Sequence, residues 1–352
     1  MQAQRGHLDR EHGDLEVGVA DVLRRQDDAH HAAPLPAPPA WLSRWEQRRP
    51  TLLVEMLAEA IGVFMYVFPG VGATVTFLVT TVAKETGFGS MQTIALCYAF
   101  GIAFAIIVAA PTSGGHLSPS FTIAFMLFKG FPARKVPFYI LAQLIGGFVA
   151  CLCVYGMWKQ QLDEVYDGFL TLGAESLVFS PSGPAGAIAL FPQTGQLLKY
   201  AFFNEFMCNL FLSLVVFSVL DATNNFVSIP GASVTIGLSY FAIIAAFAVN
   251  SVSLNAARDL GGRFACAAIY GHKCFTASSG YTALAALTTF PATLLGAGIH
   301  TLFLSDNRRM LVNYPRELHE QISIVNEQRG FTVPDRVITR DTVFRDPSPV
   351  KA

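Results

Sequence analysis

Charge is scarce in this sequence of 352 residues, because Asp, Glu, Lys and Arg together make up only 14% of it. Ordinary soluble domains carry about 25%. Of the 24 Lys and Arg residues, seven lie in residues 1–50, eight in residues 305–352 and nine in the 254 residues between them. With ten Asp and Glu, that middle region holds 19 charges. The formal net charge of −1 leaves no basic stripe to neutralise phosphates, which excludes nucleic-acid binding as the main function.

Cysteine is also rare, and its six positions show neither CxxC nor Cys/His ligand spacing. All six lie in or beside apolar segments, so we expect buried, unreactive thiols. Paired carboxylates, zinc-ligand spacing and a nucleophile elbow are missing too. The sequence therefore predicts no enzyme, and it points to no cofactor or metal site.

Long apolar segments are abundant instead, and hydrophobic residues make up 52% of the chain. Several segments run about 18 to 22 residues with almost no charge, which is the length that crosses a hydrocarbon core of about 30 Å. The sequence thus predicts an all-α integral membrane protein. Its six spans are expected at about residues 51–80, 91–111, 136–158, 199–220, 229–250 and 282–304.

The two ends of the chain differ from this middle region. Residues 1–50 are charged and then rich in Pro and Ala, a composition that cannot bury a core, so we expect a disordered tail. Residues 305–352 are expected to form a second tail, with a short helix possible at 317–327. The N-terminus is too polar for a secretory signal. Both termini are predicted to be cytosolic, because basic residues next to the spans fall on one side: Arg44, Arg48, Arg49, Lys129, Arg134, Lys135, Arg308 and Arg309.

Two further segments are apolar but too short to cross a membrane, residues 121–128 and 264–270. Each follows the second span of one half of the chain, and each half begins with a span that holds one carboxylate, Glu59 or Glu205. This pattern is typical of an inverted repeat with broken helices. We expect re-entrant half-helices near 118–129 and 255–268. Their N-termini would meet near the bilayer midplane, where free N–H groups and a partial positive charge repel cations.

The segments that open these half-helices carry a family resemblance. Residues 113–120 read SGGHLSPS and resemble the first Asn-Pro-Ala motif (SGxHLNPA) of the aquaporin, or major intrinsic protein, family. Residues 254–263 read LNAARDLGGR and resemble the second motif (NPARDxGPR). The resemblance covers about residues 51–304 and implies an aquaporin-like channel domain there. It also implies six helices and two half-helices around a narrow pore, usually in a homotetramer.

The resemblance assigns a constriction. Arg258 matches the arginine whose fixed charge supplies donors and raises the barrier for cations and protons. Tyr98 matches the aromatic residue of the constriction, and Val252 matches another wall position. The wall position of the fifth span falls at Ile243 or Ile244. A wall of this kind would be amphipathic and would suit small uncharged solutes.

Both motifs depart from the family pattern. The first consists of Ser118, Pro119 and Ser120, and the second of Asn255, Ala256 and Ala257. The resemblance implies that Asn255 donates its amide to permeating molecules. A serine in place of the first asparagine can cap the half-helix and still donate one hydrogen bond, but it reaches less far. Alanine in place of the second proline gives up a preset φ, so we expect a slightly wider or looser midplane.

Other residues receive supporting roles from the resemblance. Glu59 and Glu205 are expected to accept hydrogen bonds from the re-entrant backbone, and His116 to be a neutral imidazole rather than a pH sensor. Asp259 resembles the glycerol-facilitator branch, and Arg263 is expected to tether a loop. Close helix packing is expected at Gly146, Gly147, Gly296 and Gly298.

The sequence therefore predicts a passive plasma-membrane channel for glycerol and similar polyols, with some water flux, surrounded by lipid. The alternative within the family is a channel for water or hydrogen peroxide with poor glycerol flux. A secondary transporter would also fit inverted repeats, although no spare ionisable relay appears beyond Glu59 and Glu205. A non-conducting relative with a structural role in the membrane is the remaining alternative.

Overall fold

The computed structural model describes residues 39–85, 87–224, 226–278 and 280–306. The chain divides into two units at residue 50. In the first unit, helix α3 spans Ala40–Arg48. The predicted tail therefore includes one short helix, with Trp41 and Trp45 one helical turn apart. The disorder predicted for residues 1–38 and 307–352, and the helix suggested at 317–327, lie outside the described residues.

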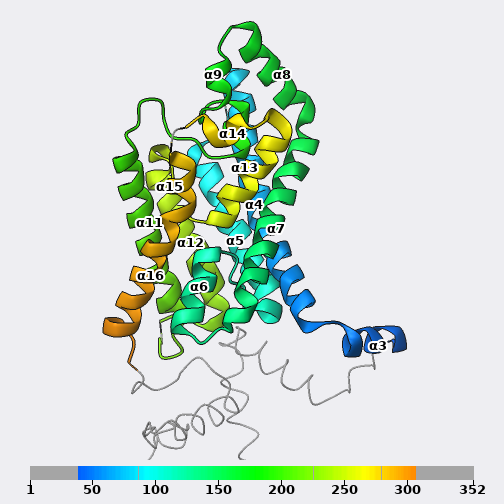
Figure 1. Ribbon diagram of the computed structural model, residues 1–352, viewed down its shortest axis with the longest axis vertical. Helices are drawn as coiled ribbons and strands as arrows, with labels where there is room; N and C mark the ends of the chain where they lie inside the picture. Colours follow the sequence, from blue (N-terminus) through cyan, green and yellow to red (C-terminus); the bar gives the residue numbers. More distant parts are fainter. Residues whose placement is uncertain (1–38, 86, 225, 279, 307–352) are drawn as a thin grey trace, which may run out of the picture. The chain divides into compact units, whose positions relative to one another are not determined.

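Within its described residues, the second unit contains six helices that are long and apolar enough to cross a membrane, as the sequence predicts. Figure 1 shows them as one bundle. The sixth consists of three consecutive pieces, the last of them a π-helical turn. The bounds are α4 (Thr51–Val82), α5 (Met91–Ser113), α7 (Val136–Met157, after the short η1, Ala133–Lys135), α11 (Leu198–Val219), α12 (Ile229–Phe247, followed by η2, Ala248–Asn250), and α15 (Tyr281–Leu287), α16 (Thr289–Ile299) and η3 (His300–Leu304).

Two shorter helices occupy the predicted re-entrant positions. Helix α6 spans Pro119–Phe128 and α13 spans Ala256–Tyr270, so at about 1.5 Å per residue neither crosses the membrane. In Figure 1 they lie in opposite halves of the bundle. Their N-terminal ends are joined directly, because the Asn255 side-chain amide donates to the Leu117 carbonyl at 2.7 Å.

The packing of the helices follows the repeat. Helix α4 packs on α5 and α7, and α11 packs on α12 and α16. The short helix of each half packs against a spanning helix of the other half: α6 packs against α16, and α13 packs against α7. The structure is therefore an inverted repeat in which neither half is complete by itself.

Close helix contact depends on glycine at defined places. A Cβ on Gly146 of α7 would lie 2.2 Å from the Ala60 carbonyl oxygen, and one on Gly147 would lie 2.8 Å from the Ala257 carbonyl oxygen. Gly296 meets Ser213 in the same way, at 2.6 Å. The prediction is confirmed for these three glycines. It is wrong for Gly298, where a Cβ would make only an ordinary contact at 3.8 Å.

The long third connection forms three small helices, α8 (Lys159–Thr171), α9 (Glu175–Val178) and α10 (Pro184–Ile188), of which α8 and α9 lie at the upper end of Figure 1. The Lys159 ammonium pairs with Asp163 and holds the pKa of that carboxyl below its usual value. Lys273 of α14 (Lys273–Thr276) pairs with Glu175 at 2.6 Å. The connection thus folds back over the end of α13.

Candidate functional site

Glu59 holds the first re-entrant loop in place. The carboxylate is fully buried in α4 and accepts from the His116 N–H at 2.9 Å and the Leu117 N–H at 2.7 Å. It also accepts from the Ser113 hydroxyl and the Gln143 amide, both at 2.7 Å. These groups satisfy a carboxylate that would otherwise be costly inside a membrane.

Glu205 does the same for the second loop. It is buried in α11 and accepts from the Ser253 N–H at 2.6 Å and the Leu254 N–H at 2.8 Å. The Asn209 amide donates to it as well, at 2.8 Å. Both halves therefore hold the re-entrant loop in the same way, with one buried carboxylate that accepts from two backbone N–H groups.

Each loop turns through a left-handed residue just before its half-helix. Leu117 has φ 53° and Leu254 has φ 60°, values that are uncommon for a side chain with a Cβ. The two carboxylates bond to the backbone N–H groups of these same two leucines. The strained turns are thereby fixed, and they aim Ser118 and Asn255 at the junction as N-caps.

The Asn255 side chain makes two hydrogen bonds and also lines the cavity. Its carbonyl oxygen caps α13 by accepting from the Ala257 N–H at 2.9 Å, and one amide N–H donates to Leu117. The second amide N–H remains for a molecule in the cavity that Asn255 lines. Ala256, where the family has proline, is the first residue of α13 and is buried.

The first motif is arranged differently. The Ser118 hydroxyl bonds to the Ser120 hydroxyl at 3.1 Å, and Ser120 accepts from Thr293 of α16 at 3.2 Å. Ser118 makes no side-chain cap on α6, which corrects the sequence-based expectation. The short hydroxyl reaches its neighbour instead of the loop backbone. Pro119 occupies the first turn of α6, as the motif requires.

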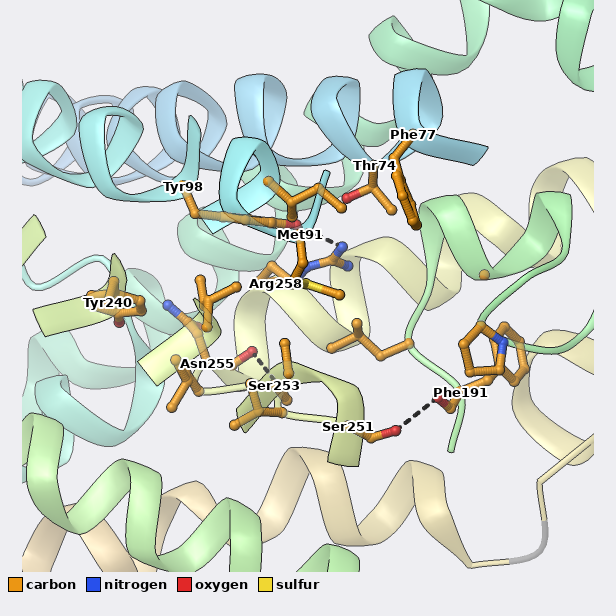
Figure 2. Close-up of a pocket in the computed structure, with 18 of the residues that line it drawn as sticks. Thr74, Phe77, Met91, Tyr98, Phe191, Tyr240, Ser251, Ser253, Asn255 and Arg258 are labelled. Atoms are coloured by element: carbon orange, nitrogen blue, oxygen red, sulfur yellow. Dashed lines mark hydrogen bonds between the residues drawn. The ribbon is translucent and has the colours of Figure 1, made fainter. Parts of the chain in front are cut away.

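Arg258 meets Tyr98 at the constriction. Its Nε and Nη2 donate to the tyrosine hydroxyl at 3.1 and 2.8 Å, and its Nη1 donates to the Ile188 carbonyl at 3.0 Å. Figure 2 shows the guanidinium beside the Tyr98 hydroxyl. Three of the five guanidinium N–H groups are used by these bonds, so two remain for a ligand.

Asp259 and Arg263 lie behind this constriction. They form a fully buried ion pair with Nε to Oδ2 at 3.0 Å, and neither lines the cavity. Arg263 also donates to the Cys274 carbonyl at 3.0 Å and the Leu190 carbonyl at 2.6 Å. Its predicted role as a loop tether is confirmed. Asp259 pairs with Arg263, and the described residues show no ion pair between Asp259 and Arg258.

These groups surround one cavity of about 150 Å³, enough for several water molecules or one small polyol. Tyr98, Val252, Asn255 and Arg258 line it, and Ile244 is the wall residue from the fifth span. Ile243 is only 2% exposed and does not line the cavity. Of the two alternatives for the fifth span, Ile244 is therefore the one that lines the wall. Other lining residues include Tyr66, Thr74, Phe77, Met91, Ile94, Phe191, Tyr240, Ser251 and Leu254.

Sequence reasoning missed Tyr66 and Tyr240, although a signal exists for the first. Tyr66 follows Glu59 by seven residues, which is two helical turns on the same face of α4. Because Glu59 faces the re-entrant loop, a residue two turns further along the same face of α4 is expected to face the cavity next to that loop.

His116 belongs to the scaffold rather than to this cavity. Its ring packs against Phe125, Phe131 and Tyr139 with centroid separations of 4.5 to 5.1 Å. Its Nδ1 lies 3.3 Å from the Thr122 hydroxyl. Among the described residues, no group of three or more His, Cys, Asp or Glu is placed to hold a metal ion.

A disulfide lies at the C-terminal end of α13 and corrects one prediction. Cys266 and Cys274 are bonded to each other, eight residues apart, because the chain turns back after α13 and brings α14 beside it. Two other cysteines, Cys151 and Cys208, are buried free thiols as predicted, whereas Cys153 is exposed.

Six spanning helices, two half-helices joined at their N-termini and a lined cavity beside that junction define a polytopic membrane channel. The chain belongs to the major intrinsic protein family, which it matches over residues 46–280. It is therefore a passive channel for water and small solutes such as glycerol, and not an enzyme.

Known proteins similar to this chain carry channel names. The chain is 41% identical over 306 residues to aquaporin-3 of Laccaria bicolor, covering 85% of this chain and 92% of that protein. It is 37% identical over 229 residues to aquaglyceroporin-2 of Rhizophagus irregularis, covering 64% and 69%. Its fold is similar to the crystal structure of the aquaglyceroporin from Plasmodium falciparum, with a TM-score of 0.60, 28% identity, and coverage of 72% of this chain and 97% of that one.

Proposed function

We propose that glycerol and related small polyols are the preferred solutes of this channel, with water as a second permeant. The observation that carries the proposal is the amphipathic constriction. Arg258 keeps two N–H donors beyond those bonded to Tyr98 and Ile188, while Ile244 and Val252 form an apolar wall of the same cavity. Donors suit the hydroxyl groups of a polyol, and the apolar wall suits its carbon backbone.

The same geometry supports the exclusion of cations. Arg258 carries a buried positive charge, and Asp259 pairs with Arg263 instead of neutralising it. The N-termini of α6 and α13 add partial positive charge at the junction. A cation or a proton would therefore meet an electrostatic barrier at two successive levels, whereas a neutral solute would not.

Stopped-flow light scattering of proteoliposomes tests this function. Wild type should take up glycerol far faster than empty liposomes and should pass water under an impermeant osmolyte. Arg258→Ala removes the charge and both free donors, so we expect proton leak to rise about tenfold or more and the preference for glycerol over larger polyols to fall. Arg134→Ala, which removes an exposed arginine, is the matched control. Glycerol entry at the rate of empty liposomes would refute the polyol proposal and leave a water or peroxide channel.

The orientation is a further part of the proposal. Basic residues beside α4 and α7, such as Arg134 and Lys135, lie at the end of the bundle opposite α8 and α14, and they support a cytosolic position for that end and for both termini. The Cys266–Cys274 disulfide supports an oxidising compartment at the other end. We place the channel in the plasma membrane, within lipid, as a homotetramer with one pore per subunit. Chemical crosslinking in membranes tests the tetramer.

A further inference from the structure

Tyr66 lines the cavity, and its hydroxyl group has no hydrogen-bond partner in the described part of the chain. The residue lies in α4, is 3% exposed, and lines the same cavity as Arg258 and Asn255. Its hydroxyl is buried and has no hydrogen-bond partner in the described part of the chain. Buried hydroxyl groups are rarely left unpaired because this costs free energy, and a molecule in the cavity that Tyr66 lines is the candidate partner.

We propose that Tyr66 is a specificity-determining residue that hydrogen-bonds to the hydroxyl groups of a small neutral polyol between Arg258 and Asn255. This inference rests on the proposed function and adds to it a recognition group on the first span. Neither of the two Asn-Pro-Ala-like motifs contains this residue.

The chemistry of the neighbouring groups makes a tyrosine hydroxyl useful here. A guanidinium can only donate hydrogen bonds, and Asn255 has its carbonyl oxygen engaged by Ala257, so both offer N–H groups to a solute. A polyol hydroxyl also carries a proton, which needs an acceptor. The Tyr66 oxygen can accept a hydrogen bond from that hydroxyl group, and the Tyr66 O–H can donate one in turn.

The scaffold does not require this hydroxyl. Seven residues after Glu205, at the place in the second half that corresponds to Tyr66, the chain has Leu212, which is fully buried. An apolar side chain therefore satisfies the repeat at this position. The backbone of Tyr66 is also held closely, since a Cβ on Gly101 of α5 would lie 2.8 Å from its Cα. The hydroxyl is thus presented from a fixed place.

The test compares wild type with Tyr66→Phe in proteoliposomes, measuring glycerol and water permeability in the same preparation. We expect glycerol permeability to fall about three- to tenfold in Tyr66→Phe while water permeability changes less than about twofold, because one hydrogen bond to the polyol is lost. Tyr270→Phe is the matched control, since Tyr270 also has a buried hydroxyl without a partner but does not line the cavity. If Tyr66→Phe does not insert, Tyr66→Met also lacks the hydroxyl and is measured in its place.

Each outcome of this experiment either supports or overturns the inference about Tyr66. An unchanged ratio of glycerol to water permeability in the Tyr66 variant, or an equal loss in Tyr270→Phe, would overturn the inference and leave the proposed function intact. A wild-type channel that passes water but no glycerol would instead overturn the polyol proposal and this inference with it. A selective loss of glycerol flux in the Tyr66 variant alone supports both.

Discussion

Single side chains at the junction decide how many donors reach the cavity. Asn255 keeps one amide N–H for a solute, whereas Ser118 bonds to Ser120 and does not line the cavity. The two halves of the junction are therefore unequal, although Glu59 and Glu205 hold their loops in the same way. A solute should be oriented mainly by the second half.

Restoring both motifs tests this inequality. Ser118→Asn together with Ala256→Pro should tighten the junction and add a donor from α6. We expect discrimination against polyols larger than glycerol to rise about twofold or more, the size of effect that one added hydrogen bond gives. Permeability to a series of polyols, measured by stopped-flow scattering, is the readout. Identical permeability and solute preference would contradict the idea that the variant motifs loosen the midplane.

Between helices, the spacing of backbones is what positions the site. Gly146 and Gly147 of α7 let that helix approach both α4 and the first turn of α13. Because α13 carries Asn255 at its N-cap and Arg258 in its first turn, the α7 contact also places the constriction. Side chains larger than glycine would force these elements apart.

Gly146→Ala should therefore destabilise the channel. The new methyl group would lie 2.2 Å from the Ala60 carbonyl oxygen, and the backbone cannot move without separating α4 from α7. We expect a loss of about 1–3 kcal/mol, the usual cost of overpacking, seen as a lower unfolding temperature in detergent. Gly298→Ala is the control in another spanning helix, with only an ordinary contact. Equal stability of the two variants would argue against this explanation of the glycine.

At the scale of the described molecule, one end of the bundle is covered and cross-linked. Helices α8, α9 and α14, the Lys273–Glu175 pair and the Cys266–Cys274 disulfide gather there, and carbonyl groups of the third connection bind Arg258 and Arg263. The third connection is thus part of the constriction, not only a linker between the two halves.

Sidedness can be measured on intact cells. An epitope inserted in the exposed part of α8 should bind antibody without permeabilisation. An epitope after Ala352 should bind only once the membrane is opened, because basic residues keep that end in the cytosol. The same two tags after permeabilisation give the control for expression. Binding of the C-terminal tag on intact cells would reverse the proposed orientation.

Much of this architecture was predictable because membranes impose simple rules. Apolar length predicted the six spans within a few residues. Two short apolar segments, together with Glu59 and Glu205 in the first span of each half, predicted the half-helices. Tyr98 and Arg258, 160 residues apart, were correctly placed in one cavity through the motif resemblance.

Other features depend on geometry that spacing does not encode. The Cys266–Cys274 bond requires the turn after α13, and the choice of Ile244 over Ile243 requires the rotation of α12. The Ser118–Ser120 contact reflects a rotamer, which no motif specifies. Tyr66 escaped notice because a tyrosine in an apolar span resembles ordinary core.

The exchange of short helices between the halves has a consequence for biosynthesis. Ser120 of α6 finds its partner Thr293 in α16, 173 residues later in the chain. At about 5–20 residues per second, the ribosome needs about 10 to 35 seconds to make that stretch. During this interval α6 lacks the helix that covers it, so the nascent first half has to be shielded inside the insertion machinery or by another membrane protein. A chain that terminates before residue 281 should be recognised as unfinished and degraded, even with four or five spans already inserted.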